Sequence, residues 1–357
     1  MPDFEPVVSD KRPGEPAAGG IHALEGVGLP GAARAGAIIG AGAASGFLYL
    51  SVVLSLLFLI PVQVVFGRHG RKAGMAAAGV ALAVTLLGRA AWLAGEGFLS
   101  LGALAFGLLV PAALLGALAL VNAPFWGALS APWRALAAAG ALALAAAPAL
   151  AGAWADPAFN DYLVGRIASL VEPFKAQLGA ATGGGFDASA LAASLDPASL
   201  AAASKDALAS CYAAILLALV GGSWWLGSRL AGPGSRGRVE APALSACRLP
   251  YALVWPFLAS WALVLAALLG GFPVAVRHAA WNLAISLSLL YAAQGLGIAS
   301  HFAQRINMPR PLRIAIAASA LLALATPTAG VAVGVVLPLL GVTEVWIPYR
   351  NPKGVGA

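Results

Sequence analysis

Residues 35–66 read AGAIIGAGAASGFLYLSVVLSLLFLIPVQVVF and contain no charged side chain. A helix of about 20 such residues is long enough to cross the hydrocarbon core of a bilayer. Comparable runs recur along the whole chain of 357 residues, which is 61% hydrophobic and only 10% charged. Soluble chains average about 25% charged residues. The sequence therefore predicts an all-α, polytopic membrane helix bundle. It excludes a soluble enzyme, a DNA-binding domain and a disulfide scaffold as the overall class.

Eight apolar runs are expected to cross the membrane. They cover residues 35–66, 74–93, 98–121, 134–152, 208–228, 251–270, 279–303 and 313–346. The first and last runs are longer than a single span of about 20 residues requires. Each can be one tilted helix or a broken pair, with Gly46 and Pro327 as the expected break points. The predicted count is therefore about eight, within a range of eight to ten.

Basic residues in the loops set the predicted orientation. Arg71 lies between the first two runs, Arg236 between the fifth and sixth, and Arg310 between the last two. Because short basic loops stay in the cytoplasm, these three loops are expected there, and the acidic segment 153–207 is expected outside. Strict alternation would leave both termini outside. A hairpin in each oversized end run would return them to the cytoplasm.

The chain divides into one membrane domain, residues 34–349, and two tails. Residues 1–33 mix proline, glycine and charge without apolar periodicity, so a disordered tail is expected there, and residues 350–357 form a short C-terminal tail. Within the insertion 153–207, apolar residues recur at helical spacing. They are Phe159, Leu163, Ile167, Leu170, Phe174 and Leu178. This pattern predicts an amphipathic helix, followed by a weaker helical pattern at Leu191, Leu195, Leu200 and Leu208. We expect a helical pair on the bundle or in the interface, with a lid over a substrate opening as the alternative.

Polar residues in the seventh run form the candidate site. Tyr291, Gln294 and His301 share one helical face. Polar side chains inside a membrane normally face the bundle interior and find partners, so Gln294 is expected to be buried and hydrogen-bonded. Two interpretations stay open: a seam of hydrogen bonds between helices, or contacts to a small ligand.

The first run carries a face of small residues, Gly36, Gly40, Gly42 and Gly46. Small residues let two helices approach closely. This face is expected to pack inside the protein or, as the alternative, to meet a membrane partner subunit.

No pattern in the chain predicts catalysis, a metal or a cofactor. The four histidines and two cysteines lack metal-ligand spacing, and no nucleophile motif or phosphate-binding loop is present in the sequence. The net charge of +7 lies in short loops, which indicates topology and a lipid partner rather than nucleic acid. Arg89 lies inside a predicted span, and we expect its guanidinium to reach the headgroups or to pair with Glu96.

The last quarter of the chain carries a resemblance. Residues 287–316 read LSLLYAAQGLGIASHFAQRINMPRPLRIAI, and residues 337–354 read LPLLGVTEVWIPYRNPKG. Through Tyr291, Gln294, Gly295, the basic loop to Arg313 and the segment 341–350, the chain resembles the YybS-like family of uncharacterised bacterial membrane proteins, a domain of unknown function. A weaker match is residues 56–74, LLFLIPVQVVFGRHGRKAG. The end motif of that family usually has aspartate where Glu344 stands here.

That family is distantly similar to the S components of energy-coupling-factor vitamin transporters and to the rod-shape protein MreD. S components use a small-residue first helix to meet their energising partner. Together with the polar face of the seventh run, the resemblance implies a multi-pass protein of the bacterial cytoplasmic (inner) membrane that binds a small molecule or assists its transport, and the lack of a catalytic pattern predicts that it is not an enzyme. An MreD-like scaffold for cell-envelope proteins, which binds no small ligand, is the alternative.

Overall fold

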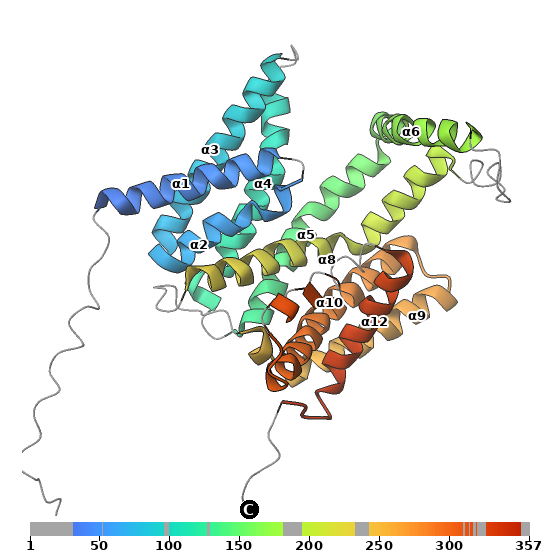
Figure 1. Ribbon diagram of the computed structural model, residues 1–357. Coiled ribbons are helices and arrows are strands. Elements are labelled where there is room, and N and C mark those ends of the chain that lie inside the picture. The colour runs from blue at the N-terminus through green and yellow to red at the C-terminus, as the bar shows by residue number, and fades with distance from the viewer. Residues whose placement is uncertain are drawn as a thin grey trace, which may run out of the picture.

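The computed structural model (Figure 1) describes residues 31–51, 53–95, 100–126, 129–180, 195–232, 243–309, 311–313, 315–316, 319 and 326–350, and within them it consists of helices joined by turns and short loops. Within these ranges, six helices are long and apolar enough to cross a membrane, and three shorter apolar helices accompany them. The predicted all-α membrane bundle is confirmed. Its main helices are α1 (Gly31–Leu50), α2 (Leu59–His69), α3 (Arg71–Gly95), α4 (Leu101–Val121), α5 (Ala131–Ala155), α6 (Pro157–Ala180), α8 (Pro197–Ala231), α9 (Val254–Leu269), α10 (Val274–Arg305) and α12 (Pro327–Thr343).

The first apolar run forms a hairpin, because α1 and α2 are antiparallel. At the tip, the Ser45 hydroxyl donates to the carbonyl of Phe58. At the open end, the Arg34 guanidinium donates to the carbonyl of His69, 3.3 Å away. The break follows Leu50 and not Gly46, where we expected it. Gly46 lies within α1, where α3 packs against it so closely that a Cβ there would lie 2.6 Å from the Cβ of Val84.

A cation joins α2 to the end of α8. Arg68 donates from Nε to the carbonyl of Ala231 at 3.1 Å and from Nη2 to the carbonyl of Leu230 at 3.0 Å. A positive charge at a helix C-terminus is favourable because the last carbonyls there lack partners within the helix. The contact places the α2–α3 turn and the end of α8 at one end of the bundle, which we call the basic end.

Helix α8, 35 residues long, bends where α10 crosses it (Figure 1). The Asn282 carboxamide of α10 donates to the carbonyl of Ala209 and accepts from the N–H of Ala213, 2.9 Å away. In a regular α-helix these two backbone groups would bond each other. A side chain inserted into the helical hydrogen-bond ladder is a recognised cause of a kink.

Helix α6 lies across the opposite end of the bundle, far from the C-terminal segment (Figure 1). It packs on α8, where Lys205 donates to the side-chain oxygen of Asn160. The amphipathic helix that we expected here is present. The second member of the pair is not a separate helix, because the residues from Pro197 onward already belong to α8, while residues 181–194 lie outside the described part of the chain.

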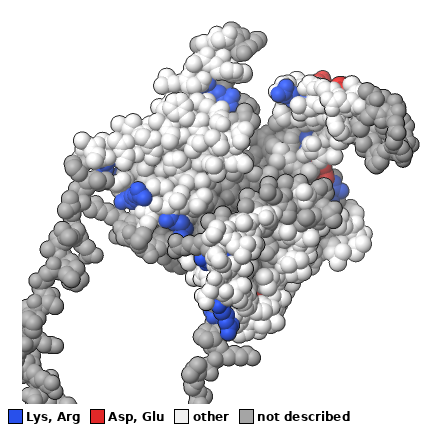
Figure 2. All heavy atoms as spheres, viewed as in Figure 1, with Lys and Arg blue, Asp and Glu red and all other residues white. Residues whose placement is uncertain are grey.

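The last apolar run is broken, and α12 begins at Pro327. Proline suits the first turn of a helix because its missing N–H would have no partner there. After α12 the chain returns to the basic end, where Arg350 meets the segment that follows α8. The hairpin of the first run is therefore present, whereas residues 320–325, directly before α12, lie outside the described part of the chain, and a hairpin in the last run stays a prediction. Figure 2 shows basic side chains along this edge and acidic ones mainly near α6.

Candidate functional site

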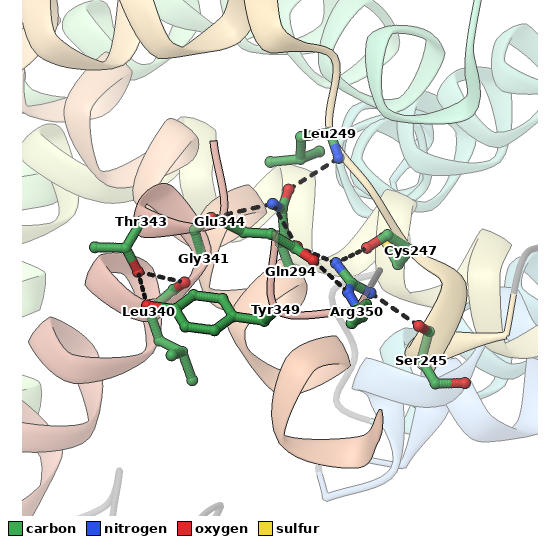
Figure 3. A network of polar contacts seen from close by, with 10 residues as sticks. All are labelled: Ser245, Cys247, Leu249, Gln294, Leu340, Gly341, Thr343, Glu344, Tyr349 and Arg350. Carbon is green, nitrogen blue, oxygen red and sulfur yellow. Dashed lines mark hydrogen bonds and ion pairs between the residues drawn. The ribbon is translucent and has the colours of Figure 1, made fainter. Parts of the chain in front are cut away.

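Gln294 is buried at the crossing of α10 and α12, with 3% of its surface exposed. Its Nε2 donates to the carbonyl of Gly341 at 3.0 Å and to Oε2 of Glu344 at 2.9 Å, and its Oε1 accepts from the N–H of Leu249 at 2.9 Å (Figure 3). One side chain thus connects α10, the end of α12 and the segment before α9. Both of its N–H groups and one acceptor position are satisfied within the protein.

The helices meet at this point because glycine permits it. A Cβ at Gly295 would lie 2.1 Å from the carbonyl oxygen of Leu337, and one at Gly341 would lie 2.0 Å from that of Tyr291. Any larger residue would force α10 and α12 apart. The glycines therefore set the distance at which Gln294 reaches both Gly341 and Glu344.

Glu344 and Arg350 form a buried ion pair beside Gln294. Arg350 donates from Nε to Oε1 of Glu344 at 2.6 Å and from Nη2 to Oε2, and the two side chains are only 3% and 6% exposed. The remaining guanidinium contacts go to the carbonyls of Ser245 and Cys247, each at 2.9 Å. A forked ion pair with further hydrogen bonds to carbonyl groups is the arrangement in which burial of both charges is tolerated. We call Gln294, Glu344 and Arg350 the clasp.

An open cleft of about 200 Å³ lies against the clasp. Its lining residues are Arg248, Leu249, Tyr251, Gln294, Glu344, Val345 and Pro348. A guanidinium, a carboxylate, a carboxamide and a phenol thus border a small space with aliphatic walls. Such a mixture suits a small polar molecule that has an apolar part.

Only one of the three candidate residues on α10 reaches this cleft. Tyr291 is fully buried, its ring packs edge-on against Phe257 with centroids 4.9 Å apart, and its hydroxyl has no hydrogen-bond partner. His301 is half-buried and stacks edge-on against Phe302. The structure therefore separates Tyr291, Gln294 and His301 into a core residue, a clasp residue and a peripheral one.

The small-residue face of α1 is also divided. Gly42 and Gly46 lie against α3, whereas a Cβ at Gly36 or Gly40 would meet no atom within 4 Å. Arg89, further along α3, has a buried Nε without a partner and lies beside Gly107 of α4. Its expected partner Glu96 lies outside the described residues.

Sequence reasoning missed the roles of Glu344 and Arg350. In the sequence, Glu344 stands out only as the position where the resembling family usually has aspartate, and Arg350 only as the start of the expected C-terminal tail. The sequence feature that could have revealed the pair is a single acidic residue, Glu344, at the end of an apolar run, with Arg350 six residues later. Helical periodicity could not use it because the chain leaves the helix after Thr343.

Among the described residues, no group of three histidine, cysteine, aspartate or glutamate side chains is placed to hold a metal ion. A second charged cluster lies near α6, where Oδ1 of Asp206 contacts Nη2 of Arg277 at 3.0 Å and Nε2 of His278 at 2.8 Å. This cluster is largely exposed and joins α8 to α10 above the Asn282 contact.

Comparison with known proteins gives a membrane family for part of the chain. Residues 197–342 match the model of a family described as predicted membrane protein (DUF2232). The match covers less than half of the chain and contains α8, α9, α10 and nearly all of α12, but it ends before Glu344. No curated protein matches, and no solved structure matches. The chain is therefore similar to an uncharacterised membrane protein family.

Proposed function

We propose that this chain is a multi-pass protein of the bacterial cytoplasmic membrane that binds a small polar molecule in the cleft beside the clasp and assists its transport. The supporting observation is the cleft itself, where Arg248, Gln294 and Glu344 border a volume of about 200 Å³. The proposal is a binding role without a catalytic step. The resemblance to S components of vitamin transporters points in the same direction.

The position of the cleft indicates from which side of the membrane a bound molecule would reach it. The cleft lies at the basic end, which the positive-inside rule assigns to the cytoplasm. A molecule bound there is one that enters from, or is released to, the cytoplasmic side. The clasp holds the side chains of Gln294 and Glu344, which border the cleft, in the positions described above.

Analysis of small molecules released from the purified protein tests this function. Two exposed aromatic residues one turn apart offer a matched pair, since Tyr251 lines the cleft and Trp255 does not. We expect wild type and Trp255→Ala to release the same molecule at the same molar ratio and Tyr251→Ala to release at least fivefold less. Purified wild-type protein that releases no small molecule would contradict the proposal.

A membrane scaffold is the second candidate, favoured by the exposure of the first half of α1. Gly36 and Gly40 are exposed, and a Cβ added at either would meet no atom within 4 Å, so there is room for a partner helix to approach the backbone closely. Crosslinking from a photoreactive residue at Gly40, with irradiated wild-type protein as the control, distinguishes the two roles. A single envelope protein captured from Gly40, with no small molecule bound, would favour the scaffold.

A further inference from the structure

Residues 344–350 form a closed loop at the basic end. The ion pair joins the first residue, Glu344, to the last, Arg350, while Trp346, Ile347 and Pro348 between them are exposed. The Tyr349 hydroxyl ties the loop to the end of α12 by donating to Oγ1 of Thr343 at 3.2 Å. Arg350 also holds the loop onto the segment before α9 through the carbonyls of Ser245 and Cys247. We call residues 344–350 the strap.

One strap residue, Val345, lies between the cleft and the apolar cluster that contains Tyr291. Val345 and Leu249 line the cleft on one side, and on the other side both pack against the apolar cluster that contains Tyr291. The hydroxyl of Tyr291 is fully buried there and has no partner. A buried donor without a partner costs about 1–3 kcal/mol, so a group that accepted its hydrogen bond would be favoured at this place.

We infer that the strap is a movable cover pinned by Arg350, and that lifting it extends the cleft to the Tyr291 hydroxyl, which donates to an acceptor oxygen of the bound molecule. The inference rests on the proposed function for the bound molecule and on the strap geometry for the movement. It identifies the ligand by chemistry as a small molecule with a carbonyl or carboxylate oxygen beside an apolar body. The apolar body fits the cluster around Tyr291, and the oxygen satisfies the hydroxyl.

Cys247 is a native reporter of this movement. Its carbonyl holds Arg350, and burial raises the pKa of its thiol above the ordinary value, an effect that the charge of Arg350 partly opposes. Loss of Arg350 would leave the pKa higher and the thiolate scarcer. Electrostatics alone therefore predicts slower alkylation, whereas lifting of the strap predicts faster alkylation, because the thiolate is the reacting form and needs access.

The experiment measures N-ethylmaleimide labelling of ligand-free protein in a Cys211→Ser background, where Cys247 is the remaining thiol. Arg350→Gln should increase the labelling rate at least tenfold. Arg350→Lys keeps the charge but loses the fork, and it should also increase the rate. Arg229→Gln, an exposed arginine at the end of α8, should leave it unchanged. An unchanged or lower labelling rate in a folded Arg350→Gln protein would contradict the inference that the strap is a movable cover pinned by Arg350.

Two additions keep the test decisive. If the arginine variants do not fold, Tyr349→Phe removes one strap hydrogen bond and should raise the rate about two- to threefold, and no rise would overturn the cover. Tyr291→Phe should leave labelling at the wild-type rate but reduce the released small molecule at least fivefold, and full retention would remove Tyr291 from the site. A wild-type protein that releases no small molecule would contradict the proposed binding function. The labelling result would still test the movement of the strap.

Discussion

Asn282 on α10 accepts a hydrogen bond from the backbone N–H of Ala213 on α8, 2.9 Å away, and donates to the carbonyl of Ala209 with the same carboxamide. One side chain thereby occupies the place of a helical hydrogen bond in its neighbour. The bend of α8 is set from outside α8, by a residue nearly 70 positions later. This contact joins α8 to α10, and both helices lie within the residues that match the membrane protein family.

Replacement of Asn282 with Leu should straighten α8. The carbonyl of Ala209 and the N–H of Ala213 would then bond each other, as in any regular α-helix. Spin labels at exposed positions 203 and 226 would lie about 35 Å apart along a straight helix, at 1.5 Å per residue. We expect the wild-type distance to be shorter and the Asn282→Leu distance to approach that value. Equal distances in the two proteins would contradict the role of Asn282 in bending α8.

Asp196 at the N-terminus of α8 should make this helix end sensitive to pH. Its carboxylate accepts from the hydroxyl and the backbone N–H of Ser199, and these bonds hold the pKa of Asp196 below its ordinary value of 3.8. Because the pKa is lower in the folded state, the stabilisation is present above about pH 4 and is lost as the pH falls through the folded-state pKa.

Thermal unfolding of Asp196→Ala and wild type measures this effect. The variant should have a lower Tm at pH 7, and the difference should vanish as the carboxylate becomes protonated. Asp196→Asn retains an acceptor for the Ser199 N–H and should lose less at pH 7. A Tm difference for Asp196→Ala that persists unchanged at pH 2.5 would rule out the charged cap as the cause.

The membrane class, the amphipathic helix and the burial of Gln294 could be predicted because each depends on local pattern. Apolar runs of sufficient length specify spans, and a polar side chain within such a run needs a partner. The hairpin in the first run was foreseen only as an alternative, and its break was misplaced at Gly46. That glycine serves close packing on α3, and a single sequence does not distinguish a packing glycine from a breaking one.

The clasp could not be predicted in the same way because its members are far apart in the chain. Gln294 meets Leu249 across 45 positions, and Arg350 meets Ser245 across 105. These contacts depend on the crossing of α10 and α12, which is determined by Gly295 and Gly341 acting together. Periodicity within one helix contains no information about such a pair. The face shared by Tyr291, Gln294 and His301 was therefore a sound reading of one helix and an incomplete description of the site.

Opposite faces of the membrane should be accessible at positions 162 and 346. Tyr162 on α6 is 68% exposed, and Trp346 in the strap is 59% exposed at the other end of the bundle. In a background without native cysteines, Tyr162→Cys should react with an impermeant maleimide in intact cells, whereas Trp346→Cys should react only after permeabilisation. The reverse result would contradict the positive-inside assignment, and equal labelling from one side would contradict the arrangement of α6 and the strap.

Gln294→Leu should destabilise the protein more than an average polar deletion between membrane helices. Such hydrogen bonds contribute about 0.6 kcal/mol on average. Here the change also leaves the N–H of Leu249 without its acceptor and removes one of the two hydrogen bonds to Oε2 of Glu344, so we expect a loss of about 1–3 kcal/mol in the free energy of unfolding. Gln304→Leu, at an exposed position on the same helix, is the matched control and should lose little. The free energy of unfolding is measured by reversible unfolding in detergent. Equal losses in the two variants would show that the hydrogen bonds of Gln294 in the clasp do not stabilise the protein.

Tyr291→Phe should have the opposite effect on the ligand-free protein. The substitution keeps the ring that packs on Phe257 and removes a buried hydroxyl that has no partner. Removing an unsatisfied polar group while preserving shape is neutral or stabilising, so the free energy of unfolding should be unchanged or rise by up to about 1 kcal/mol. Tyr212→Phe is the comparison, because the Tyr212 hydroxyl donates to the carbonyl of Ala143 at 3.4 Å and its removal should not stabilise. The free energy of unfolding of both variants is measured without added small molecules. If the Tyr291 hydroxyl serves only a bound molecule, it lowers the stability of the ligand-free protein, and its removal should not destabilise that protein. A Tyr291→Phe protein clearly less stable than wild type would mean that the hydroxyl already has a partner in the ligand-free protein.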